Sequence, residues 1–339
     1  MKIQKVLFSL CLLLTASALY AHGWSWLPQY NYQTVDIDPA SLRFVEGNVV
    51  SQGLNSINDN GVAVGAFQTD VGALSNFTFE DGRFRILSGT AGVVRGINKD
   101  GEMSGFATLS LPGANVNVGF VTDSRLNSPV HILQAPNSNL TELIGLNDKL
   151  NQLSVGDARD IETGVFRGVV FKGGEFLKFV DAGVNGYVSV RSFGSRVRFS
   201  RTGKFQKFEN GPLPNTSTSL MGVNNRGEIV GFSTDALGTH AFHLLRDGSE
   251  GPSLDWILCG LPGLFGPAFP SDINNKGEIV GTYVKGDILS GFIVMNGVAF
   301  EISFPGAENT EVSGINAAGT IVGSYLVGGV RHGFMATRN

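Results

Sequence analysis

The chain has 339 residues, of which 42% are hydrophobic and 16% are charged, and its net charge is −4. Glycine is abundant, with 46 residues against 12 prolines, a composition that indicates many tight turns between short buried strands and excludes a disordered chain. The basic residues form no stripe along the sequence, so nucleic acid is not an expected partner.

The N-terminus has the layout of a secretory signal peptide. Lys2 and Lys5 precede an apolar run from Val6 to Leu14, which is too short to span a membrane. Small residues follow, so residues 1–21 form the predicted signal, with cleavage after Ala18 or Ala21. We therefore expect a secreted, extracellular or periplasmic protein that has no membrane span after removal of the signal.

The two cysteines, Cys11 and Cys259, are too few for a disulfide framework. A lipoprotein signal at Cys11 is the alternative to an ordinary signal peptide, but Leu10 is too large for that cleavage pattern. Loss of Cys11 with the signal leaves one thiol and no internal disulfide. Cys259 follows the apolar run 254–258, which reads as a strand, so we expect it to be a buried, unreactive thiol.

One motif recurs along the rest of the chain: an apolar residue, Asn, two residues, Gly, one residue, a mostly apolar pair, and a second Gly. Five copies begin at Ile57-Asn58, Ile97-Asn98, Val223-Asn224, Ile273-Asn274 and Ile315-Asn316, and a sixth, Leu146-Asn147 with Gly156, has a two-residue insertion in its turn. Successive Asn positions are 40, 49, 77, 50 and 42 residues apart. The longest gap is close to two periods, so it predicts one degenerate unit between Glu175 and Thr202.

The motif has the chemistry of a β-hairpin turn. The Asn side chain can bond backbone N–H groups two residues on, and a Gly such as Gly277 supplies the positive φ that closes the loop. The second Gly indicates a place where a backbone or an aromatic ring approaches closely. A calcium loop at Asn58–Gly61 is the alternative, but sibling loops carry Lys99, Arg226 and Lys276, which would repel a cation.

Two further strands flank each hairpin. Those upstream are predicted at 32–38, 83–87, 130–134, 175–180, 204–208, 254–258 and 298–304, and those downstream at 76–79, 118–122, 168–171, 240–245, 291–295 and 332–335. Four short strands in every 40 to 50 residues is typical of a β-propeller blade. We predict an all-β protein in which residues 22–339 form a single propeller of about seven four-stranded blades, one of them degenerate, or of six blades with an insertion.

The repeat resembles that of the HAF family of extracellular repeat proteins. Its best copies here are Phe304-Pro305-Gly306-Ala307, the stretch from Gly314 to Gly323, and His332-Gly333-Phe334, and the family's naming tripeptide occurs at His240-Ala241-Phe242. The likeness is strong in the last three units, looser in the first three, and missing from 184–202. It implies export and a propeller-like fold, and it implies no activity.

The sequence offers little catalytic chemistry. It has no Gly-x-Ser-x-Gly elbow, and its glycines lie between predicted strands rather than before helices, so we expect no catalytic residues, no cofactor and no metal. His240 and His332 each lie 16 residues after a repeat Asn, which predicts a shared structural role in bonding a turn. Trp24 and Trp26 precede the first blade and could plug the ring, contact a partner or bind sugar.

A break in the repeat gives the one candidate ligand site. Most copies have Gly two residues before the Asn, but the fifth has Asp272, near a broadened loop that carries Leu264 and Phe265. Asp272, Leu264 and Phe265 are therefore candidate ligand-binding residues. We expect a monomeric module that binds a protein or glycan partner. The alternative is a secreted polysaccharide hydrolase or lyase, which would need convergent carboxylates near the central channel.

Overall fold

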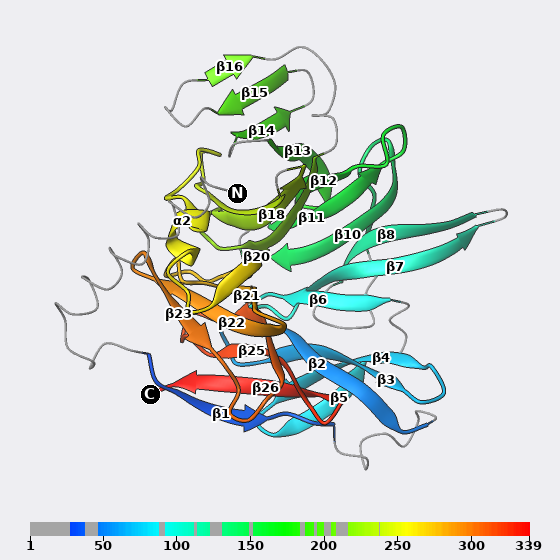
Figure 1. Cartoon of the computed structure of the whole chain (residues 1–339). Coiled ribbons are helices and arrows are strands. Elements are labelled where there is room, and N and C mark those ends of the chain that lie inside the picture. Colours follow the sequence, from blue (N-terminus) through cyan, green and yellow to red (C-terminus); the bar gives the residue numbers. More distant parts are fainter. Residues whose placement is uncertain are drawn as a thin grey trace.

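A computed structural model describes residues 28–37, 47–87, 92–111, 114–122, 131–148, 152–183, 187–192, 195–199, 205–207, 216–236 and 238–339. The predicted signal peptide, Cys11, Trp24 and Trp26 lie outside these residues. The described chain consists of β-strands and one short helix, and its sheets are arranged around a common centre as the blades of a β-propeller (Figure 1). The propeller fold is thus confirmed.

Each blade is a small antiparallel sheet, numbered here along the chain. Blades I to III contain β2 (Val49–Ile57), β3 (Ala63–Thr69), β4 (Leu74–Glu80) and β5 (Arg83–Leu87); β6 (Val93–Ile97), β7 (Met103–Leu111), β8 (Ala114–Thr122) and β9 (His131–Leu133); and β10 (Ser138–Leu146), β11 (Leu153–Asp160), β12 (Phe166–Lys172) and β13 (Glu175–Gly183). Blades IV to VI contain β17 (Ser217–Val223), β18 (Ile229–Asp235), β19 (Gly238–Leu244) and α2 (Leu254–Leu258); β20 (Leu264–Ile273), β21 (Ile279–Lys285), β22 (Ile288–Met295) and β23 (Val298–Ile302); and β24 (Asn309–Ile315), β25 (Ile321–Val327), β26 (Val330–Arg338) and β1 (Tyr30–Thr34).

The described residues form six blades, so the expectation of about seven is wrong and the six-bladed alternative with an insertion is right. The degenerate unit supplies β13 as the outer strand of blade III, and β14 (Tyr187–Ser192), β15 (Ser195–Phe199) and β16 (Phe205–Lys207) extend that sheet outward (Figure 1). Because this segment lacks an Asn turn, it has no inner hairpin to place beside the channel, and its strands can only add to the edge of an existing blade.

The first strand closes the ring. β1 pairs antiparallel with β26, from Tyr30 opposite Arg338 to Thr34 opposite Phe334, so blade VI joins three strands from the C-terminus with one from the N-terminus. Asn339 also donates its backbone N–H to the Gln29 carbonyl at 3.0 Å. Both ends of the described chain are therefore held in one sheet, which ties the last blade to the first.

Blade IV departs from the predicted pattern because its fourth element is a helix. Ser253 is the N-cap of α2 and accepts a bond from the Trp256 N–H at 3.4 Å, while Leu254 and Leu258 are each 1% exposed. Apolar residues four apart share one face of a helix, so a run that resembles a strand can bury both leucines in a single turn. The prediction of a strand at 254–258 is wrong.

The turn chemistry of the motif is confirmed. The Asn58 Oδ1 accepts from the Asn60 N–H at 3.1 Å and from the Val62 N–H at 2.9 Å, and the same pair of bonds recurs at Asn98, Asn224 and Asn274. Gly277 has φ +82°, the left-handed value that was predicted for it.

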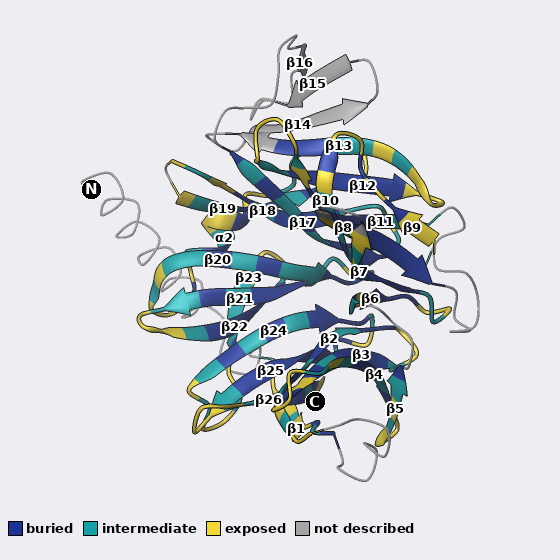
Figure 2. Ribbon diagram, turned by 90° about the vertical axis from the view of Figure 1, so that its right-hand side faces the viewer, coloured by how far each residue is buried: buried dark blue, intermediate teal, exposed yellow. Residues whose placement is uncertain are grey.

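The second Gly of the motif lies beneath an aromatic ring from the neighbouring strand. Gly281 pairs with Phe292, and a Cβ added at Gly281 would lie 2.7 Å from the Phe292 Cζ and 2.2 Å from the Phe269 carbonyl oxygen. The same Gly–Phe pairing occurs in blades I, II, IV and VI. These rings belong to the buried clusters, and Figure 2 shows buried residues running along the inner strands while exposed residues concentrate at hairpin tips.

Candidate functional site

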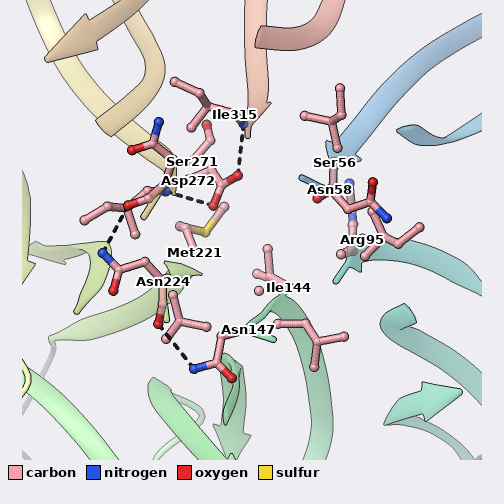
Figure 3. A pocket seen from close by; sticks show the side chains of 18 of the residues that line it. Ser56, Asn58, Arg95, Ile144, Asn147, Met221, Asn224, Ser271, Asp272 and Ile315 are labelled. Atoms are coloured by element: carbon pink, nitrogen blue, oxygen red, sulfur yellow. Dashed lines mark hydrogen bonds between the residues drawn. The ribbon is translucent and has the colours of Figure 1, made fainter. Parts of the chain in front are cut away.

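The six motif asparagines form a closed circle of hydrogen bonds around the channel. Each Asn uses its Oδ1 for its own turn and donates its Nδ2 to the backbone carbonyl of the Asn in the next blade. The donor–acceptor pairs and distances are Asn58 to Asn98 2.9 Å, Asn98 to Asn147 3.4 Å, Asn147 to Asn224 3.2 Å, Asn224 to Asn274 3.1 Å, Asn274 to Asn316 3.0 Å and Asn316 to Asn58 3.2 Å. Figure 3 shows part of this circle, which we call the asparagine ring.

The residue after each Asn adds a second, incomplete circle at the same end of the channel, the turn mouth. In four blades its backbone N–H donates to a side chain that follows the next Asn. The pairs are Lys99 to Asp148 at 2.7 Å, Asp148 to Asn225 at 2.8 Å, Asn225 to Asn275 at 2.8 Å and Ala317 to Asp59 at 2.7 Å. The carboxylates at this mouth thus serve the joints between blades.

The channel itself is narrow. Its cavity has a volume of about 70 Å³ and is lined by residues of all six inner strands, among them Ser56, Arg95, Ile144, Met221 and Asp272 (Figure 3). A bound water needs about 10–15 Å³ by this kind of measure, whereas small-molecule sites span about 300–1,000 Å³. The channel therefore has room for a few waters and not for a saccharide or a peptide.

Asp272 lies in the wall of this channel, and its carboxylate accepts two hydrogen bonds from backbone N–H groups. Its Oδ1 accepts from the Ile273 N–H at 2.8 Å and its Oδ2 accepts from the Ile315 N–H of blade VI at 3.0 Å (Figure 3). Burial raises the pKa of Asp272 to about 6, with Asp59 adding to the effect, even though the two N–H bonds act in the opposite direction. A carboxylate at a Gly position thus joins blades V and VI.

The raised pKa predicts how stability depends on pH. Because the pKa in the folded protein exceeds the ordinary value, the stabilising contribution is complete below about pH 4 and is lost as pH rises through 6. Asp272→Asn cannot ionise, so its unfolding free energy relative to wild type should rise by about 2–3 kcal/mol between pH 4 and pH 7. Urea unfolding across this range measures the difference.

Asp160→Asn provides a control of opposite sign. Partial burial favours a higher pKa at Asp160, but the bonds from Thr163 and Glu162 outweigh it and lower the pKa. Its contribution is therefore present at neutral pH and is lost as pH falls, so the deficit of Asp160→Asn should shrink toward pH 3. A pH-independent difference for Asp272→Asn would contradict the assignment.

The structure does not bring the three sequence-predicted site residues together. Leu264 and Phe265 begin β20, whereas Asp272 lies eight residues further along the same strand, which corresponds to roughly 25 Å. Leu264 packs against the core of blades IV and V, and Phe265 is 80% exposed. A single ligand contact by Asp272, Leu264 and Phe265 is therefore not the arrangement found.

Two carboxylates face each other on the inner strands of blade III, further from the asparagine turn than the residues that line the channel. Glu142 on β10 is the register partner of Asp157 on β11, and such pairs have Cβ atoms about 5 Å apart. Burial raises the pKa of Glu142, and burial raises that of Asp157 to about 6. Asp157 accepts from the Ser219 hydroxyl at 2.8 Å, its Oδ1 has no partner in the described chain, and it is 8% exposed.

A larger hollow lies between the outer strands of blade I and the inner hairpin of blade II, and we call it the I–II groove. Its volume is about 440 Å³. Its wall consists of exposed charged side chains, and its floor consists of less exposed apolar ones. The wall includes Glu80, Asp81, Arg83, Arg85, Lys99 and Asp100, and the floor includes Val62, Ile97 and Met103. Sequence reasoning missed this groove. The available signal was the alternation Arg83-Phe84-Arg85, which puts two cations on one face of an outer strand.

The two repeat histidines hold the outer element of their blades. The His240 Nδ1 lies 3.1 Å from the Asp255 Oδ2, and the His332 Nδ1 lies 2.7 Å from the Asp36 Oδ2. The shared structural role holds, although each partner is a carboxylate rather than a turn. Equivalent pairs in blades III and V are Arg167–Asp181 and Ser290–Glu301.

Cys259 differs from its expectation. It is the C-cap residue of α2 and is only partly buried, so the expectation of a buried thiol does not hold. Among the described residues, no group of three or more His, Cys, Asp or Glu side chains is placed to hold a metal ion. Nor does the described chain contain a helix long and apolar enough to cross a membrane.

No model of a known protein family and no curated protein matches the chain. Among solved structures it is similar to virginiamycin B lyase from Staphylococcus aureus (11% identity, TM-score 0.43, covering 91% of this chain and 99% of that one). The β-propeller domain of the Trilobed protease from Pyrococcus furiosus (10%, 0.46, 85% and 94%) and the lectin of Aleuria aurantia (11%, 0.40, 85% and 94%) are also similar. Likenesses this distant concern the fold alone.

Proposed function

We propose that this protein is an exported propeller of the HAF type that binds a glycan or protein partner on its surface and does not transform it. The I–II groove carries the proposal, because its volume of about 440 Å³ falls within the range of small-ligand sites and its wall holds exposed cations. Export and HAF membership rest on the signal-like N-terminus and on the repeat residues.

The hydrogen bonds that hold the propeller together support a binding role. The asparagine ring joins the blades through buried hydrogen bonds, and the β1–β26 pairing holds the two ends of the described chain in blade VI, so the surface between blades is held in a fixed shape. A fixed site loses less conformational freedom on binding than a mobile one, which favours recognition. The channel of about 70 Å³ is too small to be a reaction chamber for a polymer.

A polysaccharide hydrolase or lyase is the second candidate, and Glu142 with Asp157 is the observation in its favour. Facing carboxylates with raised pKa values are the groups that such enzymes use. Against it, Asp157 is 8% exposed and is bonded to Ser219, so a substrate cannot reach both carboxylates as they lie. Asp157 instead joins blade III to blade IV through its hydrogen bond with Ser219.

One experiment separates binding from catalysis. The purified protein is screened on glycan and surface-protein arrays, and each ligand retained is then incubated with it at pH 5 to 8 and assayed for new reducing ends or unsaturated products. We expect retention without product, and unchanged retention by Glu142→Gln. Product that forms with wild type and is abolished in Glu142→Gln would establish the enzyme instead.

A further inference from the structure

We infer that the I–II groove binds an acidic saccharide, a sugar chain that bears a carboxylate, with Arg85 as the residue that engages the carboxylate. This inference rests on the proposed binding function and names the ligand class of its site. It begins from a difference between two blades that otherwise share one register.

In blade V, an apolar cluster fills the contact with the next blade, which we call the joint. In blade V, Phe300 pairs with Ile293 and Val298 pairs with Met295, and Phe300 packs against the buried cluster between blades V and VI. The same register positions in blade I hold Arg85, opposite Thr78, and Arg83, opposite Glu80. The joint residue Phe300 and the exposed Val298 are thus replaced by two arginines, and a groove lies at the blade I joint.

The residue after the turn Gly shows a second difference between the blades. In blades II, IV and V it is a glutamate that bonds its own Asn and, in blades IV and V, a neighbouring arginine as well. In blade I the position holds Val62, which lies in the floor of the groove. The groove therefore has no carboxylate at this position beside the turn, and its acidic side chains are Glu80, Asp81 and Asp100.

Arg85 is a groove cation with no carboxylate at its register position. Within the described chain Lys99 forms an ion pair with Asp100 at 2.6 Å, whereas neither Arg83 nor Arg85 forms one. Arg83 has Glu80 opposite it, but Arg85 has Thr78. A guanidinium offers a planar fork of donors that fits a carboxylate through two parallel bonds. An incoming carboxylate at Arg85 would give this guanidinium an anionic partner.

The remaining walls fit the rest of a sugar ring. Glu80 and Asp81 supply acceptor oxygens for hydroxyl groups, while Val62, Ile97 and Met103 form an apolar floor for the C–H face of the ring. Acceptor oxygens beside arginines that have no ion pair favour a ligand that carries both hydroxyls and carboxylates. That combination describes an acidic saccharide better than a polyanion without hydroxyls.

The test uses trigalacturonate as the probe, titrated into the full-length exported protein by calorimetry and compared with its methyl ester and with maltotriose. We expect trigalacturonate to bind at least about tenfold more tightly than the ester, since one charge-assisted pair is lost in the ester. Arg85→Gln should weaken trigalacturonate about tenfold and leave the ester unchanged, whereas Arg246→Gln, an exposed arginine of blade IV, should change neither.

Arg85→Phe places the blade V residue in the blade I joint, and it should abolish binding while the unfolding free energy stays equal or rises, so that loss of binding is not loss of fold. Equal affinity for acid and ester, or binding that is unchanged in both Arg85 variants, would overturn the inference while the proposed function stands. Binding of a polyglutamate peptide as tight as that of trigalacturonate would overturn the saccharide assignment. No retained ligand on any array would sink the proposed function itself.

Discussion

Gly281→Ala is expected to destabilise the protein by about 3–5 kcal/mol, a large effect for the addition of one methyl group. The new Cβ would lie 2.2 Å from the Phe269 carbonyl oxygen and 2.7 Å from the Phe292 Cζ. The ring could rotate away, but the carbonyl belongs to the paired strand β20 and can move only if the hairpin separates. Guanidinium unfolding followed by tryptophan fluorescence or circular dichroism measures the loss.

Gly297→Ala is the matched control, because Gly297 has φ +75° and no heavy atom within 4 Å of an added Cβ. Its cost should be confined to backbone strain, about 1 kcal/mol. Equal losses for the two variants would mean that strain rather than close packing explains the second Gly of the motif.

The hairpins were predictable because their information is local. The Asn58 turn bonds and the positive φ of Gly277 depend on a few consecutive residues, and the close approach at Gly281 was expected from a Gly inside a strand. The outer strands followed from the spacing of apolar residues, as at β5 and β23.

The two wrong predictions about the fold, the strand at 254–258 and the number of blades, depend on contacts between different secondary-structure elements. Leu254 to Leu258 reads as a strand because apolar residues crowd it, yet the N-cap at Ser253 and burial of the two leucines against blades IV and V favour a helix. The blade number depended on whether the unit after Glu175 contributes an inner hairpin, and only its pairing with β13 shows that it lengthens an outer edge.

The candidate site was harder to predict because it depends on pairs of blades. Asp272 was noticed as a departure from the repeat Gly, but its bond to the Ile315 N–H comes from the next blade and is not visible along one strand. Leu264 and Phe265 are near Asp272 only in sequence. Arg83 and Arg85 acquire significance only when their register is compared with Val298 and Phe300.

The asparagine ring gives the other large expected effect. Asn58 is 5% exposed and makes three bonds, accepting from the Asn60 and Val62 N–H groups and donating to the Asn98 carbonyl at 2.9 Å. Asn58→Ala leaves all three backbone groups without this partner, so the unfolding free energy should fall by about 3–5 kcal/mol. The exposed Asn60, whose side chain bonds only the Lys99 carbonyl, provides a control, and Asn60→Ala should cost less than about 1 kcal/mol.

Asn58→Asp separates the turn from the joint between blades. The aspartate keeps the Oδ1 acceptor for Asn60 and Val62, but when ionised it cannot donate and instead presents a negative charge to the Asn98 carbonyl. Its pKa in the folded protein should be raised by burial and by that carbonyl, so the variant should be nearly as unstable as Asn58→Ala at pH 8 and should regain stability toward pH 4, where a protonated carboxyl can donate again. Denaturant midpoints for the three proteins at both pH values measure this difference. If Asn58→Asp matches wild type at pH 8, the Asn acts through its turn alone and the ring contributes no stability between blades.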